Sequence, residues 1–148
     1  MQPRLDPREL APDGFKPLIA LEGYVRNSGL EKPLIELVKL RASQINGCAY
    51  CIDMHTHDAR AAGETEQRLY CLSAWRECPF YSDRERAALE WTEAVTLITQ
   101  QGHVPDDVYE RVRAHFSETE LVNLNFAVIA INAWNRIAIP FRGVPAKR

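Results

Sequence analysis

The sequence predicts an all-α, single-domain fold, and three observations support that prediction. No stretch of the chain shows the sustained alternation of apolar and polar residues that a half-buried strand requires. From about residue 16 onward, apolar residues recur at helical spacing, and helix-capping residues stand between the apolar runs. The chain has 148 residues, 46% of them hydrophobic, which is enough for one domain with a continuous core and too short for two.

We expect about six to seven helices within residues 16–142. Residues 1–15 are rich in proline and charge, and we interpret them as an N-terminal lead-in to the domain. Residues 143–148 are interpreted as a loosely ordered C-terminal tail.

The first half of the domain is expected to contain three helices. PLIALEGYVRNSG predicts a helix that ends at Gly29, and PLIELVKLRASQING predicts a second that begins near Pro33 and ends at Gly47. Proline suits a first helical turn, whose N–H groups are unpaired anyway, and glycine accepts the left-handed backbone that ends a helix. The third helix is expected from about Cys48 to Gly63.

Capping residues predict the helices of the second half. Thr65 begins TEQRLYCLSAWRE, and PDDVYERVRAHF places acids at the positive end of a shorter helix. Capping boxes, in which a serine and a glutamate three residues on satisfy each other's backbone N–H groups, occur in SDRE at 82–85 and SETE at 117–120. The first begins a helix that reaches about Gln101, and the second begins a long apolar helix.

Charge and hydropathy argue against nucleic-acid binding, membrane insertion and secretion. The formal net charge is −2, which offers no electropositive field to nucleic acid or to an anionic membrane. The long apolar segment, residues 121–141, contains Arg136, and an arginine deep in a bilayer costs at least roughly 2.5 kcal/mol. The first residues, MQPRLDPREL, lack the apolar core of a secretory signal peptide. We therefore expect a cytoplasmic protein.

The stretch QINGCAYCIDMHTH, residues 44–57, carries the residues most suited to chemistry. It holds two of the four cysteines, Cys48 and Cys51, in C-x-x-C spacing, and His55 lies four residues after the second. Three interpretations are open, namely half of a zinc site, a structural disulfide and a redox-active thiol pair. Cytosolic proteins rarely keep structural disulfides, but they do use transient catalytic ones.

Helical geometry sorts these side chains by face. Each residue advances about 100° around a helix, so Cys48, Cys51 and His55 share one face, whereas His57 points the opposite way. His57 therefore cannot easily join the other three on one zinc ion. The remaining candidate ligands show no paired spacing: Cys71, Cys78, His103 and His115.

The same geometry favours redox chemistry over a structural bridge. A disulfide between Cys48 and Cys51 closes a very small loop, so it constrains the unfolded chain little. Unpaired N–H groups at a helix N-terminus lower the pKa of a thiol, and a histidine one turn away can take or return a proton.

Three further residues are interpreted from their surroundings in the sequence. Glu36 lies on a stripe with Leu40 and Ser43 that suits close helix packing, so its carboxylate is either a partly buried base or a solvated surface acid. Cys71 and Cys78 lie beside no obvious base and are interpreted as small apolar core residues.

Together, Glu36, Cys48, Cys51 and His55 follow the pattern E-x11-C-x-x-C-x3-H. This pattern resembles the signature of the AhpD-like alkylhydroperoxidases within the carboxymuconolactone decarboxylase superfamily. Other stretches are similar to the same family: LRASQINGCAYCIDMHTHDARAAGET, DRERAALEW, the pair His115-Phe116, and NAWNR at 132–136.

The resemblance implies an all-helical fold that assembles into trimers or hexamers, with a thiol-dependent peroxidase activity that needs no metal, flavin or other cofactor. Cys51 would match the peroxidatic cysteine, Cys48 its resolving partner, and His55 and Glu36 a proton relay. The substrate would be a hydroperoxide, and an external dithiol or a thioredoxin-like protein would reduce the resulting disulfide. The better-studied AhpD members carry a histidine just before the second cysteine, where this chain has Tyr50.

The order of attack has arguments on both sides. Position at the helix start favours Cys48 as nucleophile, whereas the resemblance and the histidine one turn further on favour Cys51, which we adopt. Two other function classes are considered. One is a different carboxymuconolactone decarboxylase-like reaction, which generally needs no C-x-x-C pair, and the other is a non-catalytic redox sensor.

The apolar C-terminal helix is expected either in the core or in a contact between subunits, because it is hydrophobic on nearly every face. Its polar residues Asn132, Asn135 and Arg136 could form a buried network that lines a pocket or could serve structure alone. The structural role is the commoner one for buried polar groups.

Overall fold

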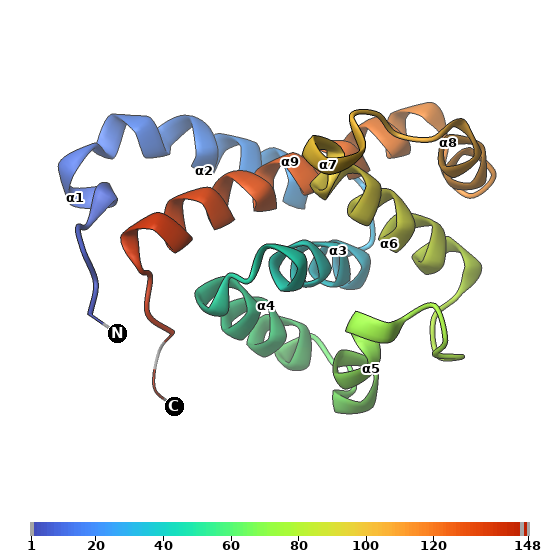
Figure 1. Ribbon diagram of the computed structural model, residues 1–148, viewed down its shortest axis with the longest axis horizontal. Coiled ribbons are helices and arrows are strands. Elements are labelled where there is room, and N and C mark those ends of the chain that lie inside the picture. The colour runs from blue at the N-terminus through green and yellow to red at the C-terminus, as the bar shows by residue number, and fades with distance from the viewer. Residues whose placement is uncertain (1, 146, 148) are drawn as a thin grey trace.

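The structure is a computed structural model that describes residues 2–145 and 147. These residues form nine α-helices, one short 3-10 helix and no strand (Figure 1), which confirms the all-α prediction. The α-helices are α1 (Pro7–Leu10), α2 (Pro12–Arg26), α3 (Lys32–Asn46), α4 (Ala49–Ala61), α5 (Glu66–Cys71), α6 (Asp83–Thr96), α7 (Ile98–Gln101), α8 (Asp106–Arg113) and α9 (Glu118–Phe141). The 3-10 helix, Leu72–Ala74, continues α5.

Local signals place most helix ends where they were expected. Gly47 ends α3 with a left-handed backbone, φ 71°, and the chain enters α4 one residue later. Both predicted capping boxes are present, with the serine side chain and the glutamate side chain each accepting from the other residue's backbone N–H. The seven predicted helices therefore correspond to α2 to α6, α8 and α9, except that the helix expected to reach about Gln101 is divided at Leu97 into α6 and α7.

The N-terminal region differs from the prediction. Helix α1 lies inside the expected lead-in of residues 1–15, and α2 begins at Pro12, so the expectation that helices start near residue 16 is wrong. Asp6 caps α1 by accepting from the N–H groups of Arg8 and Glu9, at 2.8 and 3.3 Å. At its other end α2 stops at Arg26, and the positive φ of Gly29 turns the chain toward α3.

Helix α3 occupies the centre of the molecule. It packs against α4, α6 and α9, while α2 lies along α9 on the outside (Figure 1). Leu34, Ile35 and Val38 join the core beneath α9, whereas Leu37 and Leu40 join a second cluster beneath α4 and α5. A helix that is buried on several sides fixes the elements around it, and here it holds α4 against α9.

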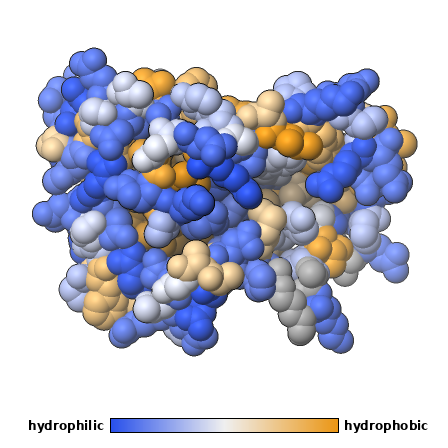
Figure 2. Space-filling view, turned by 180° about the vertical axis from the view of Figure 1, so that it is seen from behind, coloured by the Kyte–Doolittle hydropathy of each residue, from blue (hydrophilic) through white to orange (hydrophobic). Residues whose placement is uncertain are grey.

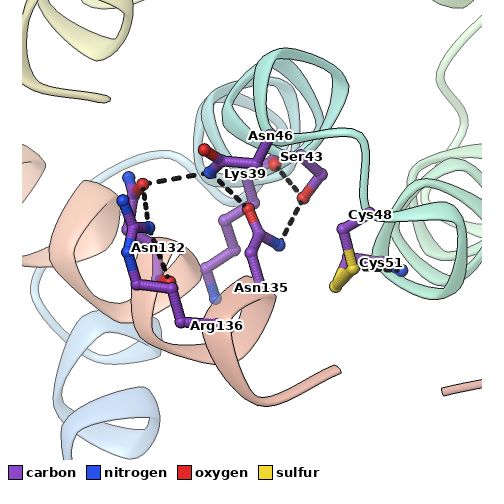
Figure 3. Close-up of a disulfide and its surroundings, with 8 residues drawn as sticks. All are labelled: Lys39, Ser43, Asn46, Cys48, Cys51, Asn132, Asn135 and Arg136. Atoms are coloured by element: carbon purple, nitrogen blue, oxygen red, sulfur yellow. Dashed lines mark hydrogen bonds between the residues drawn. A yellow bond between two sulfur atoms is a disulfide. The ribbon is translucent and has the colours of Figure 1, made fainter. Parts of the chain in front are cut away.

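A polar network joins the ends of α3 and α9 (Figure 3). Asn135 is fully buried, accepts from Asn46 Nδ2 at 2.8 Å and donates to Ser43 Oγ at 3.1 Å. Asn132 accepts from Asn46 Nδ2 at 3.0 Å and from Arg136 Nη1 at 2.8 Å. Of Asn132, Asn135 and Arg136, only Asn135 is buried, while Asn132 is half-buried and Arg136 is exposed, so Arg136 is not part of a buried network. The contacts pair polar groups between two helices and serve structure. None of the described helices, α9 included, is long and apolar enough to cross a membrane.

Candidate thiol site

The two cysteines of the C-x-x-C motif lie at the start of α4. Cys48 is the N-cap residue, and its Sγ accepts a hydrogen bond from the N–H of Cys51 at 3.3 Å. Cys51 stands in the first turn, so both sulfurs lie where unpaired N–H groups and the helix dipole favour a thiolate. The sulfurs are joined in a disulfide, with a Cα–Cα distance of 5.3 Å (Figure 3). The pair is thus close enough for reversible oxidation.

His55 and Glu36 meet across the interface between α4 and α3. His55 Nδ1 lies 2.7 Å from Glu36 Oε2, and both side chains are largely buried. Where the carboxylate is ionised it can only accept, so Nδ1 then carries the hydrogen of this contact and Nε2 takes no part in it. Glu36 is therefore the partly buried partner of a histidine, and not a solvated surface acid. His57, by contrast, is 54% exposed and pairs with Asp58.

A pocket of about 620 Å³ opens beside the thiols. Cys51 and His55 both line it, as their shared helix face predicted, whereas Cys48 and Glu36 are not among its described lining residues. Phe15 of α2 and Trp134 of α9 face each other across 5.8 Å between ring centroids and line the same space. A mostly apolar space of this volume with a few polar groups matches an ordinary small-molecule site.

The supposed lead-in forms one wall of this pocket. Residues 3–8 line it, and Arg4 ties this segment to the end of α9 through two hydrogen bonds. Its backbone N–H donates to the carbonyl of Phe141 at 3.1 Å, and its Nη1 donates to that of Pro140 at 3.0 Å. Sequence reasoning missed this wall, although Asp6 followed by Pro7 is a helix-start signal that could have indicated ordered structure.

A buried ion pair lies next to the pocket and was also missed. Lys39 of α3 is 1% exposed and donates to Glu22 of α2, which lines the pocket and also accepts from Arg26 at 3.2 Å. Burial alone raises the pKa of Glu22, but the hydrogen bonds and charges of Lys39 and Arg26 outweigh it and hold that pKa below its usual value. The sequence feature that could have indicated this ion pair is the position of Lys39 between the apolar residues Val38 and Leu40.

The sequence profile of the Carboxymuconolactone decarboxylase family matches residues 12–94, which include every predicted site residue. The chain belongs to the carboxymuconolactone decarboxylase family. The chain is 52% identical over 139 residues to the uncharacterized protein YdfG of Bacillus subtilis, and the match covers 94% of each protein.

Several solved structures share this fold. The Agrobacterium tumefaciens protein ATU0492, a protein of unknown function named as a candidate AhpD antioxidant defence protein, superimposes with a TM-score of 0.96. That match has 48% identity and covers 99% of this chain and 100% of the other. The debrominase Bmp8 gives a TM-score of 0.81 over 91% of this chain and 72% of its own, and its 18% identity supports a common fold alone.

Cys71 and Cys78 do not line the pocket. Both are free thiols, and they pack in the cluster that holds Leu69, Trp75 and Tyr81. Burial and the neighbouring Cys78 sulfur raise the pKa of Cys71. Within residues 2–145 and 147, no three His, Cys, Asp or Glu side chains are grouped closely enough to hold a metal ion.

Proposed function

We propose that the protein is a thiol-dependent hydroperoxide reductase that uses Cys51, Cys48, His55 and Glu36. One observation supports this most strongly: Cys51 and a histidine held by a carboxylate line the same pocket, and the second sulfur is already within bonding distance of the first. Likeness to the candidate AhpD protein of A. tumefaciens over nearly the full chain adds support.

The reaction oxidises the thiol pair and reduces the peroxide. His55 takes the proton of the Cys51 thiol, the thiolate attacks the peroxide oxygen that carries hydrogen, and the O–O bond breaks. The protonated His55 then returns that proton to the alkoxide, which leaves as an alcohol. Cys51 is then a sulfenic acid, and the Cys48 thiol displaces its hydroxyl as water to form the disulfide. An external dithiol or a thioredoxin-like protein reduces that bond by exchange and restores both thiols.

Thiol ionisation alone is too weak to make this efficient. Lowering a thiol pKa from about 8.5 to about 7 raises the thiolate fraction at neutral pH about fifteenfold, but the lower nucleophilicity takes back about fivefold. Proton transfer to the leaving oxygen typically contributes about 10² to 10⁴. The pair of His55 and Glu36 is therefore the larger part of the proposed catalysis.

Cys51 is proposed as the attacking sulfur because it lines the pocket and Cys48 does not. In Cys48→Ser, brief treatment with a hydroperoxide is expected to leave a sulfenic acid on Cys51, since the resolving thiol is gone. A dimedone-type trap followed by peptide mass spectrometry locates it. Labelling of another cysteine in that variant would remove Cys51 from its role, and absence of any sulfenic acid would argue against the peroxidase proposal itself.

The proton relay predicts a graded kinetic effect. His55→Gln is expected to slow the first oxidation of Cys51 by about 10² to 10⁴, because the alkoxide then leaves without a positioned acid. Glu36→Gln should slow it less, by roughly tenfold to a hundredfold, because the imidazole remains but loses its charged partner. Stopped-flow single-turnover oxidation separates this step from reduction of the disulfide. Glu110→Gln, an exposed change on α8, is the matched control, and unchanged rates in His55→Gln would contradict the relay.

The proposal includes a homo-oligomer, a trimer or hexamer, and a stripe of exposed apolar residues on α9 supports it. Val122, Phe126 and Ile129 are 54%, 37% and 43% exposed and share one helix face. Ile129→Glu is expected to lower the assembled mass measured by multi-angle light scattering, because a charge would be buried in the contact. Ile98→Glu, equally exposed at 43% on α7, is the control. A wild-type mass of one chain would refute the assembly.

A redox sensor and a different reaction of the same family are the alternatives. A sensor would consume one equivalent of hydroperoxide per thiol pair and then stop, even with excess dithiol. Sustained consumption under these conditions distinguishes a reductase from a sensor.

A further inference from the structure

The pocket beside Cys51 contains more positive than negative charge, although the whole chain has a net charge of −2. Four arginines line it, against the two carboxylates of Asp6 and Glu22. The four are Arg4, Arg8, Arg26 and Arg142. A positive site on a negative protein concentrates anionic ligands and orients them.

Both carboxylates of the pocket lining already have partners. Asp6 accepts from the backbone N–H groups that begin α1, and Glu22 accepts from Lys39 and Arg26. Both carboxylates therefore already accept hydrogen bonds from groups of the protein itself.

Three of the arginines remain without an acidic partner. Arg4, Arg8 and Arg142 form no ion pair with any described side chain. Arg8 instead lies over the ring of Phe15, 5.7 Å from its centroid, and the guanidinium of Arg4 donates to the backbone carbonyl of Pro140. A guanidinium has five N–H donors in a fork that matches a carboxylate, so these groups keep most of their binding capacity.

The rest of the pocket wall is apolar and reaches the thiol. Met54, Ile131 and Trp134 line it together with Cys51, while the three arginines without an acidic partner come from residue 4, from α1 and from the residue after α9. The surface on the side of the molecule that carries both chain ends shows hydrophilic groups beside hydrophobic ones (Figure 2). The pocket volume of about 620 Å³ is far larger than hydrogen peroxide needs, since a water molecule takes up about 30 Å³ in the liquid.

We infer that the pocket selects organic hydroperoxides with an apolar body and a carboxylate remote from the peroxide group, as in a hydroperoxy fatty acid. The body packs against the apolar wall, the peroxide reaches Cys51, and the carboxylate pairs with Arg8, Arg142 or Arg4. This inference rests on the proposed reductase function and adds the class of substrate. Cys51 reduces the hydroperoxide group as in the proposed function, and the carboxylate of the substrate does not react.

The test compares a medium-chain hydroperoxy fatty acid with its methyl ester, which have the same body and differ by one charge. With saturating dithiol at low ionic strength, kcat/KM for the acid is expected to exceed that for the ester by about 3- to 20-fold, the range of one or two partly exposed ion pairs. Added salt should bring the ratio toward one.

Two variants locate the effect. Arg8→Gln with Arg142→Gln is expected to bring the ratio of kcat/KM for the acid to kcat/KM for the ester close to one. Lys32→Gln with Lys16→Gln removes two charges from exposed lysines that do not line the pocket, and should keep the preference. Circular dichroism checks that each variant is folded, and the salt dependence of the wild type tests the same point without any substitution.

A binding measurement separates this inference from the function on which it rests. Quenching of tryptophan fluorescence, with Trp134 in the pocket wall, reports binding of a saturated fatty acid and its methyl ester, neither of which reacts. Tighter binding of the acid by a similar factor supports the inference even if no hydroperoxide is turned over, which would overturn the proposed function alone. Equal binding and equal kcat/KM of acid and ester overturn the inference and leave a reductase without charge preference.

Discussion

Cys51→Ser is expected to abolish hydroperoxide turnover, with a loss of at least about a thousandfold in kcat/KM. Serine keeps the size of the side chain and its place on the pocket wall, but a hydroxyl is not ionised at neutral pH and is a poor nucleophile toward the O–O bond. No other described cysteine lines the pocket, so no second thiol is placed to replace it. A steady-state assay with an excess of dithiol, following loss of hydroperoxide, measures the effect.

The matched control is Cys71→Ser, which removes a partly exposed sulfur from a cluster outside the pocket and should leave turnover near wild type. Cys48→Ser should behave differently from both. It should allow one oxidation of Cys51 and then turn over only as fast as the external dithiol reduces the sulfenic acid directly. Wild-type turnover in Cys51→Ser would rule out the mechanism at its first step.

Glu22→Gln is expected to lower the free energy of unfolding by about 2–4 kcal/mol. The change leaves the ammonium of Lys39 buried without its carboxylate, and an uncompensated buried charge is far more costly than a missing surface pair. Urea unfolding at neutral pH measures the loss. Combining Glu22→Gln with Lys39→Met should recover much of it, because neither charge is then left alone.

The same pair predicts a pH dependence of definite sign. The pKa of Glu22 in the folded protein lies below its ordinary value of 4.5, so its contribution is complete above that value and is lost as the pH falls through the folded pKa. The stability difference between wild type and Glu22→Gln should therefore stay constant above about pH 5 and shrink as the pH falls below 4.5. Glu110→Gln, an exposed control, should change stability by less than about 0.5 kcal/mol. A difference that grows in acid would contradict the assignment.

Helix boundaries were predictable where short-range chemistry decides them. The turn at Gly47 and the capping boxes of Ser82 with Glu85 and Ser117 with Glu120 involve residues at most three apart, and the structure has all of them. The placement of Cys51 and His55 on one face is of the same kind, because four residues on a helix always span about one turn. Helix α1 is an exception, since its four residues contain too little periodic pattern and its signal is limited to the cap at Asp6 and the proline after it.

The meeting of Glu36 with His55 could not be derived in this way. The two residues are nineteen positions apart on different helices, and both a buried and a solvated carboxylate fit the sequence equally well. Burial of Lys39 and the closing of the pocket by residues 3–8 depend likewise on how α2, α3 and α9 pack.

The sequence by itself thus determined the helical fold, the ends of most helices and the face shared by Cys51 and His55, because each of these follows from contacts within a few residues of the chain. Only the tertiary structure decided that Glu36 holds His55, that Lys39 pairs with Glu22, and that the N-terminal segment completes the pocket wall. Those contacts join segments that are distant along the chain, and their geometry is set by the packing of whole helices against α3.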